Sequence, residues 1–175
     1  VLTLTTQSTR TSLGNKVGNT YPVYWSEGDR VVVNGTLSEA AMINPDNPAA
    51  AQFTINESLE YPRSILYTDN YTPEYANCVE FPTEQTYTKD GIQSGYAPMY
   101  GYVTTASTNI QLKHLATILR FPVKSANDGT TLRNITIETE KGEAISGLFR
   151  VECTNGSITA TESAESSLSY NANAE

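Results

Sequence analysis

The sequence predicts an all-β fold, an antiparallel β-sandwich with long loops and little helix. Its strongly apolar segments are short and rich in β-branched residues, and Gly, Pro, Asn and Asp separate them at close intervals. The chain also has eleven Tyr against one Trp and four Phe. Tyrosine suits half-buried strands because its ring packs while its polar tip stays in water. These features favour two packed sheets over a helical bundle.

The first half of the chain alternates short strands with turns. Val1–Thr6 mixes apolar and β-branched residues without a helical period, which predicts an isolated strand. Asn34-Gly35 predicts a tight turn, and the prolines of residues 45–48 predict an irregular stretch. Residues 68–95 are expected to be mainly loop because prolines exclude central-strand pairing over much of that stretch. Further strands are expected at 23–25, 30–33, 52–55, 64–67 and 79–81.

The second half contains the most apolar stretch, Leu115–Val123, which is expected to be the central core strand. Ser125–Gly129 then predicts a hairpin connection to a strand over 132–139. Lys141-Gly142 and Asn155-Gly156 are expected as turns. Other strands are expected at 99–103, 109–112, 144–145, 148–151 and 157–159. The side chains expected to be mainly buried are Ile118, Phe121, Ile135, Ile137 and Phe149.

The length of 175 residues fits one domain. Residues 1–160 are expected to form this β-sandwich domain. Residues 161–175 are small and polar and are expected to be a tail, or the start of a linker to a C-terminal domain that the chain does not include.

Charge and motif content argue against several function classes. The net charge of −8 and the pI near 4.6 repel phosphate backbones, so nucleic acid is not an expected partner. The sequence has no HExxH, CxxC, Walker-A, GxGxxG or GxSxG pattern. No cofactor or metal is expected, and the chain is not expected to be an enzyme.

Individual reactive residues also have structural explanations. His114 is the single histidine, and a structural role at the start of the expected core strand is favoured over catalysis. The carboxylate pairs Glu57 with Glu60 and Glu138 with Glu140 match a glycosidase only if a cleft separates them by a fixed distance. Solvated strand or loop positions are the favoured interpretation. Oxygen-rich turns, the kind of segment in which calcium ligands occur, lie at 46–47, 69–70 and 127–128, but they lack EF-hand spacing and turn formation explains them.

Cys78 and Cys153 leave two interpretations open. The two residues form a disulfide, or each is a separately buried small apolar side chain, which is the favoured interpretation. A zone dense in tyrosine is expected to pack in the core and loops. Its alternative is an aromatic platform for a sugar or a protein. The zone comprises the tyrosines at positions 61, 67, 71, 75, 87, 96, 100 and 102.

Several stretches, taken in order, resemble the fimbrillin family, the subunits and tip proteins of the type V pili of Bacteroides-type Gram-negative anaerobes. The most specific stretch is V-Y-W-S-E-G-D-R-V-V-V-N-G, over residues 23–35. The similar stretches are Thr9–Leu13, Val23–Gly35, Phe81–Tyr87, Ala97–Gly101, Leu112–Phe121, Ile135–Glu138 and Ile145–Val151. Together they span most of residues 9–156.

The resemblance implies a transthyretin-like β-sandwich at the cell surface, in a fimbrium or the outer membrane, derived from an exported lipoprotein precursor. It implies partners that are other pilus subunits joined by strand exchange, with a host or bacterial surface protein or glycan as an adhesion target. In the family a protease cuts after a basic residue that follows the first strand. Arg10 is the matching residue here and Lys16 the second, although a plain solvated loop cation explains Arg10 as well.

Two functions therefore stand as expectations. The first is a structural or adhesive pilus subunit that assembles by β-strand addition. Its displaceable first strand carries Val1, Leu2 and Leu4, and this strand is expected to cover core side chains rather than to be an integral central strand. The alternative is a carbohydrate-binding surface lipoprotein that uses the tyrosine-rich loops.

Overall fold

The computed structural model describes residues 2–6, 12–13, 23–68, 71–86, 96–107, 109–119, 121–127 and 129–172. Within these ranges the chain is all-β, as predicted, and its one helical element is the 3₁₀ turn η1 (Pro73–Tyr75). The strands are β1 (Leu2–Thr6), β2 (Ser12–Leu13), β3 (Val23–Tyr24), β4 (Val32–Val33), β5 (Thr36–Leu37), β6 (Met42–Asn44), β7 (Asn47–Phe53), β8 (Arg63–Tyr67), β9 (Cys78–Phe81), β10 (Glu84–Thr86), β11 (Met99–Val103), β12 (Ile110–His114), β13 (Asn134–Glu138), β14 (Gly147–Glu152), β15 (Ser157–Ala160) and β16 (Ser167–Asn171).

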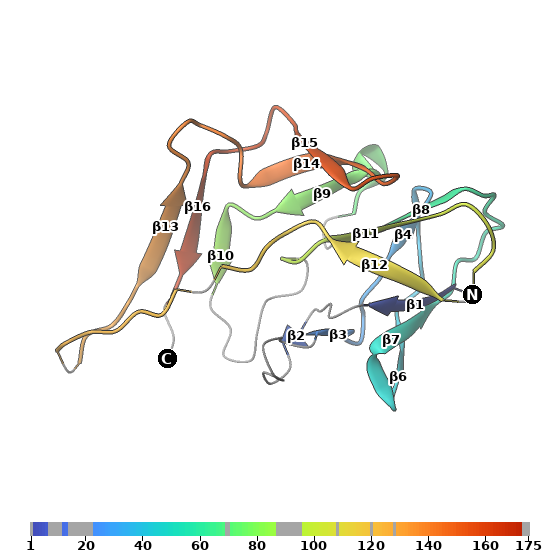
Figure 1. Cartoon of the computed structure of the whole chain (residues 1–175), viewed down its shortest axis with the longest axis horizontal. Helices are drawn as coiled ribbons and strands as arrows, with labels where there is room; N and C mark the ends of the chain where they lie inside the picture. Colours follow the sequence, from blue (N-terminus) through green and yellow to red (C-terminus); the bar gives the residue numbers. More distant parts are fainter. Residues whose placement is uncertain are drawn as a thin grey trace.

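The largest sheet has eight strands in the order β5-β4-β8-β11-β12-β1-β7-β6 (Figure 1). Alternate side chains along its strands point to opposite faces. One face carries the main core. That core consists of Leu2, Leu4, Trp25, Val31, Val33, Ala51, Phe53, Ile65, Tyr67, Met99, Ile110 and Leu112.

A second layer packs against the opposite face of this sheet. Leu66 of β8 lies between Ile65 and Tyr67 in sequence, and it joins a second core that includes Phe149 of β14. This layer is the three-stranded sheet β15-β14-β9. The second core consists of Val32, Leu66, Val79, Phe149, Val151 and Cys153. Two sheets with a shared apolar interior give the sandwich-like arrangement expected from the sequence.

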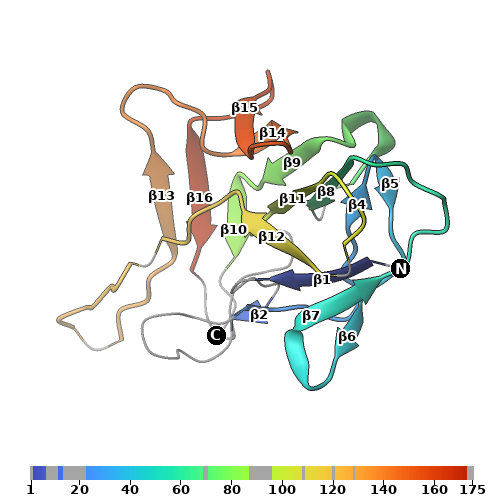
Figure 2. The same ribbon diagram turned by 45° about the vertical axis from the view of Figure 1, so that its right-hand side comes forward.

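A third sheet, β10-β16-β13, lies at the side of the molecule away from β6 and β7 (Figure 2). Its strand β16 lies within the expected tail of residues 161–175. Ser167–Asn171 pairs with β13 antiparallel and with β10 parallel, so backbone hydrogen bonding gives this polar segment a place in the fold. The sequence expectation was wrong there because ladder formation does not require apolar side chains. Most described strand pairs are antiparallel, as expected, and two are parallel, β1 with β12 and β10 with β16.

The predicted turn at Asn34-Gly35 is confirmed. Both residues have positive φ, 49° and 83°, and they join the paired residues Val33 and Thr36 of β4 and β5. These angles are typical of the two-residue type I′ hairpin. By contrast, the expected irregular stretch at 45–48 is only partly irregular: residues 45–46 form the turn of the β6–β7 hairpin, with a register shift next to Asn44, and residues 47–48 begin β7.

The expectation for Leu115–Val123 was wrong. Strand β12 ends at His114, and the described residues that follow are not in a strand. Ile118 is 54% exposed and Phe121 is 51% exposed, whereas Phe149 is buried as predicted. Ile135 and Ile137 are half-buried. No described residue between β12 and β13 is in a strand, and the predicted hairpin connection at 125–129 includes Asp128, which lies outside the described residues.

Candidate functional site

Strand β1 lies between two other strands of the eight-stranded sheet. On one side it pairs antiparallel with β7, with Leu2 opposite Phe53 and Leu4 opposite Ala51. On the other side it pairs parallel with β12, with Leu4 beside Ile110. The expectation that β1 is not an integral strand was therefore wrong, since its backbone is hydrogen-bonded on both sides. Removing β1 would open two strand edges, those of β7 and β12.

The side chains of β1 enter the main core. Leu4 is fully buried and Leu2 is 4% exposed, so the two described members of the predicted set Val1, Leu2 and Leu4 are both core residues. Burying each leucine contributes about 1.5–3 kcal/mol. The groove between β7 and β12 that β1 fills is here called its seat. Ladder hydrogen bonds on both edges add about 1 kcal/mol each. A molecule with an empty seat is therefore less stable than the intact fold by on the order of 5–10 kcal/mol.

An aromatic cluster supports the core that receives β1. Trp25 packs edge-to-face on Phe53, with ring centroids 4.9 Å apart, and on Tyr67, at 5.4 Å. The Tyr67 hydroxyl donates to Asp29 Oδ1 (3.1 Å), and the Ser26 amide donates to Asp29 Oδ2 (2.7 Å). The buried carboxylate of Asp29 thus fixes both the turn after Trp25 and the position of Tyr67, because a buried carboxylate needs such donors.

The predicted processing residues, Arg10 and Lys16, lie outside the part of the chain that the structure describes. Val1, the first residue of the predicted strand, also lies outside it. Leu2 and Leu4 are therefore the members of the predicted set that the structure places, and it places them together on one strand.

The tyrosine-rich zone is distributed over several environments. Tyr67 lies in the main core, and Tyr100 packs against the second core while its hydroxyl donates to the Asn155 carbonyl (3.1 Å). The Tyr61 ring stacks under the Arg63 guanidinium at 4.1 Å. Tyr75 and Tyr102 are 43% and 37% exposed. The described tyrosines therefore pack mainly as core and loop residues, which was the favoured interpretation.

The carboxylate pairs considered for catalysis lie at the surface. Glu57, Glu60, Glu138 and Glu140 are all exposed, and Glu57 Oε2 accepts a hydrogen bond from the Thr36 hydroxyl (3.2 Å). Within the described ranges, no group of three or more His, Cys, Asp and Glu side chains could hold a metal ion. In the oxygen-rich turn at 46–47, side-chain oxygens accept local backbone amides, as expected of turn formation.

Cys78 and Cys153 are both free and both buried, which agrees with the favoured interpretation as small apolar side chains. Burial, followed by the negative charge of Glu152, raises the pKa of the Cys153 thiol from 9.0 to about 11. Burial also raises the pKa of Cys78, against a smaller opposing effect of Arg150. Both thiols are thus kept in the unreactive protonated form at neutral pH.

Comparison with known proteins leaves the family open. No protein-family model, no curated protein and no solved structure matches this chain. Among the residues that the structure describes, no helix is long and apolar enough to cross a membrane. The seat of β1 is therefore the feature on which a functional proposal can be built.

Proposed function

We propose that this chain is a structural or adhesive subunit of a cell-surface pilus, of the fimbrillin type, and that it assembles by β-strand addition between subunits. The single observation that supports this proposal most strongly is the position of β1. An N-terminal strand that fills a seat between two other strands leaves, on removal, a groove that another strand can occupy. Main-chain hydrogen bonds to both walls would give such an exchange stability.

The geometry of the seat defines the incoming strand. It must run parallel to β12 and antiparallel to β7, and it must present apolar side chains at alternate positions, as Leu2 and Leu4 do. A slip of one residue would turn these side chains away from the core, so the core fixes the register. The emptied groove is costly, and this cost supplies the driving force for an incoming strand.

Limited digestion with an Arg-specific protease tests the proposal. Cleavage at Arg10 is expected to allow release of the first strand, after which the protein binds a synthetic peptide of residues 1–6. The same peptide with Leu4→Glu should not bind because it places a charge in the core. Arg10→Lys is the matched control, since it keeps the positive charge and removes the cleavage site. A cut at Arg10 that changes neither stability nor peptide binding would contradict the mechanism.

A further inference from the structure

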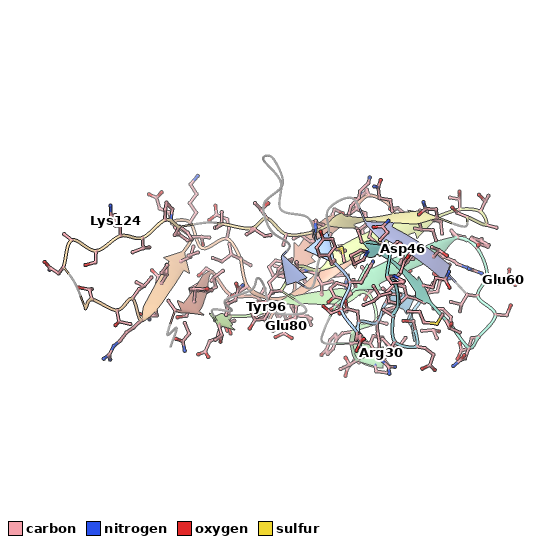
Figure 3. All side chains as sticks on the ribbon, turned by 90° about the horizontal axis from the view of Figure 1, so that it is seen from below. Arg30, Asp46, Glu60, Glu80, Tyr96 and Lys124 are labelled. Atoms are coloured by element: carbon pink, nitrogen blue, oxygen red, sulfur yellow. The ribbon has the colours of Figure 1, made fainter. Side chains whose placement is uncertain are left out.

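The segment Leu115–Val123, here called the arm, begins at Leu115, which packs against the second core, and then exposes large apolar side chains. Leu119 is 62% exposed and Val123 is 60% exposed, in addition to Ile118 and Phe121. Figure 3 shows Lys124, which follows the arm, at the opposite end of the molecule from Asp46 and Glu60 of the large-sheet region. In an extended chain Leu119, Phe121 and Val123 lie on one side, because they are two residues apart. The arm thus has the pattern of a strand, without a strand partner among the described pairings.

The nearby strand β13 is an edge strand. Within the described part of the chain it has a neighbour on one side only, β16. Thr139 donates to Ser166 of the segment before β16 (3.0 Å), and Arg133 accepts from Ala172 (2.8 Å). Successive residues of a strand direct their amides to alternate sides. The odd-numbered residues of this segment therefore face β16, and Asn134, Thr136 and Glu138 direct their amides to the open edge.

This open edge has few of the features that normally block strand addition. The register of β13 with β16 is continuous over all five residues, without a bulge, and β13 contains no proline. Ile135 and Ile137 lie opposite Tyr170 and Leu168 of β16, so these four side chains share one face. All four are half-buried and belong to neither core. A regular edge with an apolar face is a template for an additional strand.

Antiparallel addition of the arm conflicts with Pro122. In antiparallel pairs, opposite residues direct their amides either both toward or both away from each other. Two antiparallel registers match two large exposed apolar side chains of the arm with Ile135 and Ile137, either Leu119 with Phe121 or Phe121 with Val123. Both turn position 122 toward β13, where a proline has no N–H to donate. The hairpin that the sequence alone suggests therefore loses a ladder bond in either register.

Parallel addition matches apolar residues of the arm with Ile135 and Ile137 and also keeps Pro122 turned away from β13. In a parallel pair, a residue that directs its amides at the neighbour lies beside one whose amides point away. Leu119 and Phe121 can then lie beside Ile135 and Ile137, while Pro122 faces outward. Within one chain such an arrangement needs a return crossover of roughly a dozen residues or more, and only residues 124–133 separate the arm from β13. The partner that can supply the parallel arm is a second molecule.

The charges of the two surfaces are complementary. Residues 113–133 carry four basic residues against one acidic residue, a net charge of +3 in a chain of net charge −8. Residues 134–172, which include β13 and β16, carry six acidic against two basic residues. In the two parallel registers that match apolar residues, Lys124 falls beside Glu138 or Glu140. Such pairing favours association of two copies despite their overall negative charge.

From these observations we infer that the arm of one copy adds to the free edge of β13 in a second copy as a parallel strand, and that reciprocal exchange of arms gives a dimer. This contact is independent of the proposed pilus function, because it uses β13 and leaves β1 in its seat. It covers Leu119, Phe121 and Val123 and completes the ladder on the free side of β13.

Sedimentation equilibrium of the intact, undigested chain tests the inference. The wild type is expected to dimerise reversibly, and more weakly at high salt because the contact includes opposite charges. Phe121→Glu should weaken the dimer at least about tenfold, because it places a charge in an apolar strand contact. Thr136→Pro should also weaken it, because it removes an edge-facing N–H while the bonds of odd-numbered residues to β16 remain.

Two controls distinguish this contact from nonspecific hydrophobic association and from unfolding of the variants. Met42→Glu makes the same kind of change at a residue with 54% exposure on β6, far from β13 in the sheet order, and it should leave the dimer unchanged. Circular dichroism melting should show that all three variants remain folded. Lys124→Glu should weaken the dimer about threefold, and adding Glu138→Lys with Glu140→Lys should restore it.

Three results would overturn the inference. The first is a wild type that stays monomeric at every concentration. The second is a dimer that Phe121→Glu leaves intact, or that Met42→Glu dissociates equally. The third is a monomer in which Lys124 resists a Lys-specific protease, which would show that the arm pairs within its own chain. None of these results bears on the exchange of β1, which is assayed after cleavage at Arg10.

Discussion

The same substitution at two leucines distinguishes the core strand β1 from the exposed arm. Leu4 has no exposed surface and lies between Ala51 and Ile110. Leu4→Ala removes three carbons at about 0.8 kcal/mol each and leaves a cavity, so the expected loss is about 3–4 kcal/mol. Leu119 is 62% exposed. Leu119→Ala therefore loses only the buried fraction of that transfer energy, about 1 kcal/mol or less, without a cavity.

Urea unfolding followed by circular dichroism measures both values. The protein concentration must be one at which sedimentation shows a monomer, because Leu119 also lies in the inferred dimer contact. The midpoint should fall for Leu4→Ala with an unchanged slope, since the surface exposed on unfolding stays the same. Equal losses for the two variants would refute the assignment of the arm to the surface. They would mean that the arm is a core strand, as the sequence pattern suggests.

Two further predictions concern backbone crowding and pH. Gly147→Ala should destabilise the protein by at least about 2 kcal/mol more than Gly142→Ala in the same unfolding assay. Both glycines have positive φ, but a Cβ at Gly147 would lie 2.5 Å from the Ser163 carbonyl oxygen, whereas a Cβ at Gly142 meets nothing within 4 Å; similar losses would contradict the crowding. The raised pKa of Cys153, about 11 against 9.0, should make the free energy of unfolding decline as pH rises from 9 to 11, because the unfolded state gives up its proton first. Cys153→Ala should remove this part of the decline, and an identical pH profile in wild type and variant would exclude it.

Much of the fold could be predicted because local chemistry decides it. Asn34-Gly35 tolerates positive φ at both positions, so this turn is specified by two residues. The alternation of buried and exposed residues in β12 and β14 follows their sequence pattern directly. Leu2 and Leu4 could likewise be identified as the buried anchors of the first strand.

The errors concern partners, which local pattern does not specify. The arm has the apolar, β-branched composition of a core strand, but no strand of the described chain pairs with it, and its residues Ile118, Leu119, Phe121 and Val123 are exposed to solvent. Conversely, β16 has only Leu168 and Tyr170 as apolar residues, yet it pairs on both sides. The sequence also gave no sign that β1 would lie between β7 and β12, because both of its partners are far away in the chain.

That distance affects the order in which the molecule folds. Leu4 lies beside Ile110, so the first residues of the chain need a partner strand that is synthesised more than a hundred residues later. Contacts of such long sequence separation form slowly, because the loop between them must close first. Strand β1 is therefore expected to be among the last of these strands to dock. Until it does, β7 and β12 remain exposed edges to which other strands can pair.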